Sequence, residues 1–154
     1  TFTLGATTPS YDLETEIETT FETAHITEAL LHKTTEQFTG TIQQKPPIFS
    51  AIKKDGVRLY ELARRGETTE IKTREVSINL FEITKIELPT IDFRVVCSKG
   101  TYIRSLAYDF GLALNSGAHL SALRRTKIGD FDVIDTTSLE AFEAALQQAE
   151  ASNN

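Results

Sequence analysis

The sequence contains one cysteine, no methionine and no apolar run that approaches the length of a membrane-spanning helix. The single cysteine, Cys97, cannot form a disulfide within the chain, which is typical of proteins kept in the reducing cytoplasm. No signal peptide opens the sequence. We therefore expect a cytoplasmic protein with no membrane contact. Because the chain does not begin with Met, we also expect a piece of a longer protein with a trimmed start.

The signatures of several enzyme and metal-site classes are also absent. There is no glycine-rich phosphate loop and no G-x-S-x-G nucleophile elbow. The three histidines have no Cys or carboxylate partners at the spacing of a zinc site, and one thiol cannot make a thiolate site. The sequence thus predicts no metal site.

Two carboxylates stand out by position. Asp109 follows Arg104 by five residues, about 500° of helical rotation, so the two do not share a helix face well. We therefore expect Asp109 to be structural. Asp12 lies in a predicted loop, and the sequence identifies no partner for it. The residues alone show no self-contained catalytic set.

The length and composition suit one globular α/β domain. A chain of 154 residues with 40% apolar and 25% charged residues can bury a core. The net charge is −6, but the basic residues gather in two segments. Residues 45–65 carry six basic and two acidic residues, and residues 94–127 carry six basic residues and one acidic residue. This distribution predicts one positive face on an acidic protein, although basic residues also cluster by chance on solvated faces.

The periodicity of the apolar residues predicts both strands and helices. Thr27 is a suitable N-cap for a helix from Glu28 to Phe38, and Ser138 is one for a helix over 139–149. Two neighbouring segments of alternating residues predict a hairpin. In chain order, the other expected elements are a strand over 1–6, a loop over 7–22 with a short edge strand, a short helix over 57–65, the hairpin strands 76–88 and 91–97, a helix over 105–114, an extended segment over 118–128, and a turn with a short strand over 129–135.

The stretch from Cys97 to Arg104 joins a predicted strand to a predicted helix. Such turns leave the first helical N–H groups unpaired, and these groups favour an anion together with the helix dipole. Lys99 and Arg104 add two cations there. Positive charge in a first helical turn is unfavourable for the helix, so we expect Arg104 to pair with a carboxylate or phosphate from elsewhere. A plain structural salt bridge is an equally good interpretation.

A second informative stretch runs from Gln44 to Gly66. Pro46 and Pro47 fix an extended segment that cannot be a central strand. The short helix that follows presents its arginines outward. A rigid basic loop with a short basic helix suits a phosphate backbone. From these residues alone, however, an ordinary surface loop is the better-supported interpretation.

Four motifs spread over nearly the whole chain in a definite order. They are Leu4-Gly5-x-x-Thr8-x-Ser10-x-Asp12, then Gln44-x-Pro46-Pro47-x-x-Ser50-Ala51-x-Lys53-x-x-Gly56-x-x-x-Tyr60-x-x-Ala63-Arg64-x-Gly66, then Cys97-Ser98-Lys99-Gly100-Thr101-Tyr102-Ile103-Arg104, and Gly117-Ala118-His119-Leu120-x-x-Leu123-Arg124-Arg125-Thr126. Together they resemble the bacterial tRNA pseudouridine synthase B (TruB) family. Archaeal and eukaryotic guide-RNA-dependent synthases share a motif like the third, but they are not known for the second in this form.

The resemblance implies a fold and a reaction. The fold is the α/β (α+β) pseudouridine synthase fold, with a mixed, mostly antiparallel sheet and flanking helices, here truncated at its N-terminus. The reaction converts the T-loop uridine of tRNA to pseudouridine, with no cofactor and no metal. The base is flipped out of its loop, and an aspartate nucleophile lets it detach, turn and rejoin through carbon. The implied partner is the T-arm of tRNA, bound by a monomer.

The resemblance also assigns roles to residues. Arg104 matches the arginine that pairs with the nucleophilic aspartate. Tyr102 and Leu123 match residues around the flipped base. Residues 44–66 match an insertion that grips the T-arm. The residues expected to contact RNA are Lys53, Lys54, Arg64, Lys99 and Arg125.

The chain departs from the family pattern in several places. The nucleophilic aspartate and the tyrosine that stacks on the base both belong to sequence upstream of residue 1. Thr15 stands where a Gly is usual, and Ser10 replaces a usual Thr. No RNA-binding PUA domain follows Asn154. We therefore expect residues 1–154 to be a single partial catalytic domain, inactive alone. The alternatives are a non-catalytic RNA-binding module and a structural domain with a solvated basic surface.

Overall fold

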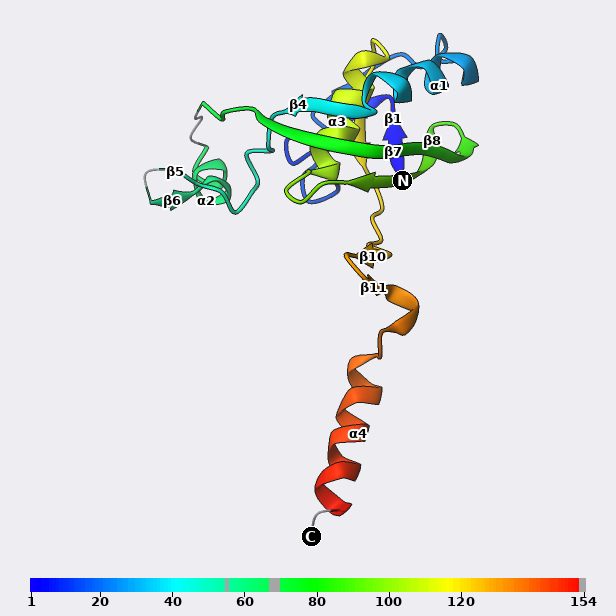
Figure 1. Cartoon of the computed structure of the whole chain (residues 1–154). Coiled ribbons are helices and arrows are strands. Elements are labelled where there is room, and N and C mark those ends of the chain that lie inside the picture. Colours follow the sequence, from blue (N-terminus) through cyan, green and yellow to red (C-terminus); the bar gives the residue numbers. More distant parts are fainter. Residues whose placement is uncertain (55, 67–69, 153–154) are drawn as a thin grey trace. The chain divides into compact units, whose positions relative to one another are not determined.

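The computed structural model describes residues 1–54, 56–66 and 70–152, and it describes the backbone alone for residues 53, 54 and 150–152 (Figure 1). We predicted one domain from the length; the chain divides into two compact units, Thr1–Ala122 and Leu123–Asn154. None of the helices in the described residues is both long and apolar enough to cross a membrane.

A five-stranded sheet forms the frame of the first unit (Figure 1). Its strands are β1 (Phe2–Leu4), β4 (Gly40–Gln44), β7 (Arg74–Glu87), β8 (Thr90–Cys97) and β9 (Ala118–Leu120). They lie in the order β4-β7-β8-β1-β9, and every neighbouring pair is antiparallel. The predicted hairpin is confirmed, with Ile86 of β7 opposite Ile91 of β8. Alternation along both strands directs one set of apolar side chains into the core.

Helix α3 (Ile103–Ala113) packs into the core of this unit through Phe110. The Phe110 side chain is fully buried, and four further rings surround it: Phe93 at 5.3 Å, Phe81 at 5.6 Å, Phe2 at 6.0 Å and Phe38 at 6.1 Å between centroids. Inclined rings at these distances attract one another beyond the effect of burying their area. Leu106 and Leu114, one turn to either side, are also fully buried. The opposite face of α3 is therefore left for polar contacts.

Helix α1 (Glu28–Gln37) lies against β7 and α3. Its predicted cap is confirmed, because the Thr27 hydroxyl accepts a hydrogen bond from the Leu30 backbone N–H at 3.2 Å. Leu31 is fully buried. The loop before this helix contains the short paired strands β2 (Ala6–Thr7) and β3 (Thr19–Thr20), where we expected a short edge strand.

The 44–66 segment contains a two-stranded hairpin, β5 (Lys53–Lys54) with β6 (Val57–Arg58), followed by α2 (Leu59–Arg64). The helix therefore begins two residues later than the 57–65 we predicted, because Val57 and Arg58 pair with β5. Leu59 is buried as expected. Gly66 follows the helix at φ 71°, a conformation in which glycine has no steric penalty.

The second unit contains the hairpin β10 (Lys127–Ile128) with β11 (Phe131–Asp132), a 3-10 turn η1 (Val133–Asp135) and the helix α4 (Leu139–Ser152). Ser138 caps α4 as predicted, accepting from the Ala141 N–H at 3.2 Å. The extended segment predicted over 118–128 contains β9 at its start and β10 at its end. Strand β9 ends at Leu120, whose N–H donates to the Tyr11 carbonyl at 2.8 Å, and regular pairing resumes only at Lys127.

The close approach of α3 to β9 predicts an unusual response to Gly111→Ala. Alanine normally stabilises a helix by about 1 kcal/mol relative to glycine. Here a Cβ at position 111 would lie 2.2 Å from the Ala118 nitrogen, so the backbones must separate. We expect a loss of about 2 kcal/mol in the free energy of unfolding, measured by urea denaturation. The neighbouring exposed substitution Leu112→Ala is the control, and equal stability of the two variants would contradict this packing.

Candidate active site

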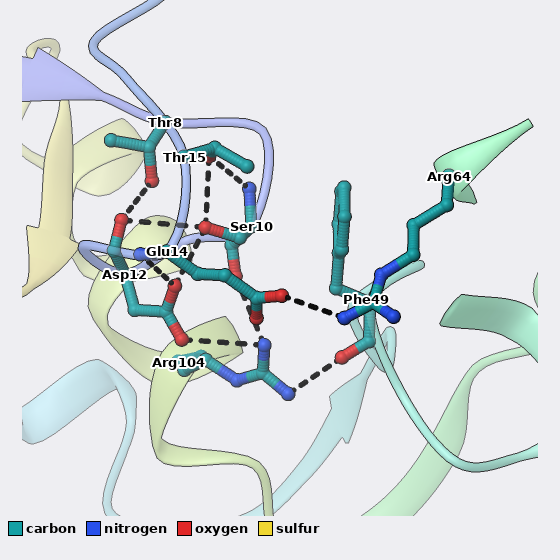
Figure 2. A network of polar contacts seen from close by, with 8 residues as sticks. All are labelled: Thr8, Ser10, Asp12, Glu14, Thr15, Phe49, Arg64 and Arg104. Carbon is teal, nitrogen blue, oxygen red and sulfur yellow. Dashed lines mark hydrogen bonds and ion pairs between the residues drawn. The ribbon is translucent and has the colours of Figure 1, made fainter. Parts of the chain in front are cut away.

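Arg104 is the second residue of α3, and its guanidinium contacts two other segments of the first unit (Figure 2). Its Nη1 lies 3.4 Å from Asp12 Oδ2 and donates to the Ser10 carbonyl at 3.3 Å. Its Nη2 donates to the Phe49 carbonyl at 2.7 Å. The Arg104 side chain is 21% exposed and that of Asp12 is 25% exposed, so this ion pair is partly shielded from water. Within the described residues, the anion that we expected beside Arg104 is thus a carboxylate.

The sequence identified no partner for Asp12, whereas the structure shows several. Besides its contact with Arg104, the carboxylate accepts on Oδ1 from the Ser10 hydroxyl at 2.6 Å and from the Glu14 N–H at 3.0 Å. The Thr8 hydroxyl donates to the Asp12 carbonyl at 2.6 Å. Figure 2 shows these contacts converging on one loop. A local side-chain network of this kind holds a loop in one conformation.

The start of α3 is fixed by a buried amide. The Gln44 side chain, 2% exposed, accepts from the Tyr102 N–H at 2.8 Å and donates to the Tyr102 carbonyl at 3.0 Å. The Ser105 hydroxyl adds a bond to the Lys45 carbonyl at 2.7 Å. One of the helix-start N–H groups that we considered for an anion is thus taken by Gln44. Gln44 opens the second sequence motif, but the sequence predicted no individual role for it.

The expected site residues of the first unit whose side chains are described lie near the start of α3 and at the end of α2. Tyr102 directly precedes α3, two residues before Arg104 in the sequence, and is half-buried. Lys99 is exposed in the turn before α3. Arg64 lies at the end of α2, where its Nη2 is 3.4 Å from Glu14 Oε1 (Figure 2). The Arg64 guanidinium also lies 5.4 Å from the ring centre of Tyr60. The insertion therefore contacts the loop that holds Asp12.

The other four expected residues either have no described side chain or belong to the second unit. The side chains of Lys53 and Lys54 lie outside the described residues, although their backbone forms β5. Leu123 and Arg125 belong to the second unit, where both are exposed, Leu123 at 61%. Their roles stay predictions.

Histidines and carboxylates do not gather into a metal site in the part of the chain that the structure describes. His25 lies with Nε2 2.7 Å from the Leu114 carbonyl, and His119 with Nδ1 3.0 Å from the Ala6 carbonyl. Both rings thus bond to backbone that they help to hold in place.

Beside the Asp12 loop, Tyr11 stacks on Tyr108 of α3 with ring centroids 4.1 Å apart and planes inclined by 18°. Burial, with the nearby Tyr108, Asp109 and Glu18 groups, raises the pKa of Tyr11 to about 12. Its hydroxyl therefore stays protonated at neutral pH. Burial alone raises the pKa of Asp109 to about 6.

The ion pair between Arg104 and Asp12 should show in a double-mutant cycle. We expect Arg104→Met and Asp12→Asn to couple by about 1 kcal/mol in the free energy of unfolding, because the ion pair is partly shielded from water. The control cycle is Lys85→Met with Glu87→Gln, a shorter pair of 2.9 Å that is exposed to solvent and should show no measurable coupling. Additive effects of Arg104→Met and Asp12→Asn would refute the interaction.

The raised pKa of Asp109 predicts that this residue destabilises the folded chain by an amount that depends on pH. The folded chain keeps this proton up to about pH 6, whereas the unfolded chain loses it near the ordinary value of 3.8. Unfolding thus releases a proton across this interval, and the Asp109 contribution to stability falls as pH rises from about 4 to about 6. Thermal unfolding should therefore show the Tm advantage of Asp109→Asn growing over this interval and then levelling off. A Tm difference that does not change with pH would contradict this.

Comparison with known proteins identifies the family. Residues 1–103 match the family described as TruB family pseudouridylate synthase (N terminal domain), and residues 104–154 match the tRNA pseudouridylate synthase B C-terminal domain. A chain from a Cbf5-Nop10-Gar1 complex has a similar fold, with a TM-score of 0.56 and 34% identity over 71% of this chain and 28% of that one. The predicted pseudouridine synthase fold is thus confirmed.

Curated relatives agree with these matches. The chain is 69% identical to the tRNA pseudouridine synthase B of Flavobacterium johnsoniae over 147 residues, covering 96% of this chain and 64% of the relative. It is 53% identical to the protein of the same name from Phocaeicola vulgatus, covering 97% of this chain and 64% of the relative. The chain therefore spans just under two thirds of the length of these relatives. It belongs to the TruB family of pseudouridylate synthases, as its four motifs predicted.

Proposed function

We propose that this chain is part of an enzyme that isomerises uridine to pseudouridine in the T-loop of tRNA. The observation that carries the proposal is the Arg104 guanidinium, held at the start of α3 beside the Asp12 loop. The printed names of the relatives, tRNA pseudouridine synthase B, support the reaction and the substrate. The base leaves the ribose through nitrogen and rejoins it through carbon. That carbon loses one proton and the nitrogen gains one, so atoms balance without a co-reactant.

Arg104 has the properties needed to hold a second carboxylate. A guanidinium offers five N–H donors in a planar fork, and the described residues place three acceptors around it: Asp12, Ser10 and Phe49. Donor capacity thus remains for the nucleophilic aspartate expected upstream of residue 1. A cation beside a carboxylate favours its ionised form, which is the nucleophilic form.

The rest of the substrate contact is proposed on the same basis. Tyr102, Leu123, Lys99, Arg64 and Arg125 would contact the flipped base or the RNA backbone, as the family resemblance implies. Arg64 is paired with Glu14 in the absence of RNA, and both side chains are exposed, at 66% and 50%. Exposed ion pairs of this kind contribute little to stability, so phosphate can replace Glu14 as the partner of Arg64. We further propose that the enzyme acts as a cytoplasmic monomer.

Pseudouridine formation on unmodified tRNA tests the proposal. The assay compares the 154-residue chain, the same chain with its upstream segment restored, and the restored protein carrying Arg104→Ala or Arg104→Lys. We expect activity only in the restored protein and a loss of about 100-fold or more with either substitution, because lysine cannot bond several acceptors in one plane. The control is Arg94→Ala, which removes an exposed arginine from β8.

The outcomes separate the candidate functions. Activity of the 154-residue chain alone would place the nucleophile within residues 1–154 and overturn the assignment of Arg104. If the restored protein is inactive yet binds tRNA with an affinity that falls steeply with salt, the chain belongs to a non-catalytic RNA-binding module. Absence of salt-sensitive binding would leave only a structural domain.

A further inference from the structure

Three consecutive residues of the Asp12 loop contact helix α3. The Ser10 carbonyl and the Asp12 carboxylate contact Arg104 (Figure 2), and between them the Tyr11 ring stacks on Tyr108. Arg104 and Tyr108 are four residues apart, which places them on one face of the helix, one turn from each other. The ion pair and the ring stack are therefore neighbouring contacts of the same loop on the same helix.

Tyr11 adopts a conformation that its own residue type disfavours. Its φ is 65°, in the left-handed region that side chains other than glycine, asparagine and aspartate rarely occupy. Such a conformation persists when surrounding contacts fix it. Here the Tyr11 N–H donates to the Thr8 carbonyl at 3.1 Å, and the Tyr11 carbonyl accepts from the Leu120 N–H at 2.8 Å. The ring stack on Tyr108 completes these contacts.

One face of the Tyr11 ring is occupied by Tyr108, 4.1 Å away with nearly parallel planes, so this face cannot receive a base, and the residue is half-buried. A hydrophobic anchor that served stability alone would not need a left-handed backbone one residue from the carboxylate that pairs with Arg104. The backbone conformation, the stack and the ion pair instead share one consequence, which is a fixed distance between the loop and α3.

We propose that Tyr11 and Tyr108 are positioning residues that clamp the Ser10–Asp12 loop onto α3 and thereby hold the Arg104 guanidinium in its working orientation. Neither ring touches the reacting atoms, and both act through Arg104. The inference rests on the proposed function for its catalytic consequence. Its structural part, the restriction of Arg104, does not depend on that function.

Variants can separate the stack from the backbone conformation. Tyr11→Phe and Tyr108→Phe keep both rings and remove one hydroxyl each. Tyr108→Ala removes the stack and leaves Tyr11 in place. Tyr11→Gly removes the stack but relieves the backbone, because glycine adopts positive φ without steric cost. If the stack serves stability alone, Tyr11→Gly lowers the free energy of unfolding but leaves the restriction of Arg104 and the value of kcat unchanged, whereas a clamp predicts that both are lost as in Tyr108→Ala.

The first measurement follows rotation of the Arg104 guanidinium in the 154-residue chain by NMR of its side-chain 15N resonances. These resonances are assigned by their loss in Arg104→Lys. We expect restricted rotation of the guanidinium in the unsubstituted chain and in both Phe variants. Rotation should become fast in Tyr11→Gly and Tyr108→Ala while the remaining backbone spectrum is retained. Restricted rotation in these two variants would overturn the clamp, whether or not the protein is an enzyme.

The second measurement uses the protein with its upstream segment restored and the rate of pseudouridine formation. We expect kcat to fall about 10- to 100-fold in Tyr11→Gly and Tyr108→Ala, with KM for tRNA unchanged and activity retained in the Phe variants. Unchanged kcat in Tyr11→Gly would overturn the catalytic part of the proposal. Inactivity of the unsubstituted restored protein would instead refute the proposed function, and the resonances of Arg104 would still decide the clamp.

Discussion

The burial of Phe110 among the aromatic rings of the sheet is the packing interaction on which the site depends. It fixes α3 against β8 and β1, with Leu106 and Leu114 filling the core one turn to either side. Because this apolar stripe determines the rotation of the helix about its own axis, it also determines where the polar face points. Arg104 and Tyr108 lie on that face. The site is thus a consequence of core packing, with the loop of Asp12 adapting to a helix that is already placed.

Local signals in the sequence were enough to predict most of the regular structure. The caps at Thr27 and Ser138 and the hairpin of β7 with β8 depend on residues that are close in the chain, and each was predicted correctly. The start of α2 was placed two residues too early, because Val57 and Arg58 pair with a strand whose two residues carry no distinctive pattern. Strand β9 ends at Leu120, inside the extended segment predicted over 118–128, and the Leu120 N–H bonds to the Tyr11 carbonyl, far away in the sequence.

The site was predictable only in part for the same reason. The charge of Arg104 in the first turn of a helix indicated a missing anion, and that argument was sound. Nothing local indicated that Asp12, more than ninety residues earlier, would supply a carboxylate. Nothing local indicated a structural role for Gln44 either, because a glutamine beside a basic segment is usually a surface residue, and only the structure shows that it is buried. The only sequence signal for Asp12 and Gln44 was that both belong to motifs that resemble a family. Such motifs can include residues that make long-range contacts, whereas periodicity reports local structure alone.

The paired hydrogen bonds of Gln44 with Tyr102 link two parts of the molecule that would otherwise vary independently. One amide bonds both the N–H and the carbonyl of the residue before α3, and the insertion follows directly after it in the chain. The end of β4 and the start of α3 are therefore fastened at one point, and neither backbone segment can shift without straining or breaking these two hydrogen bonds.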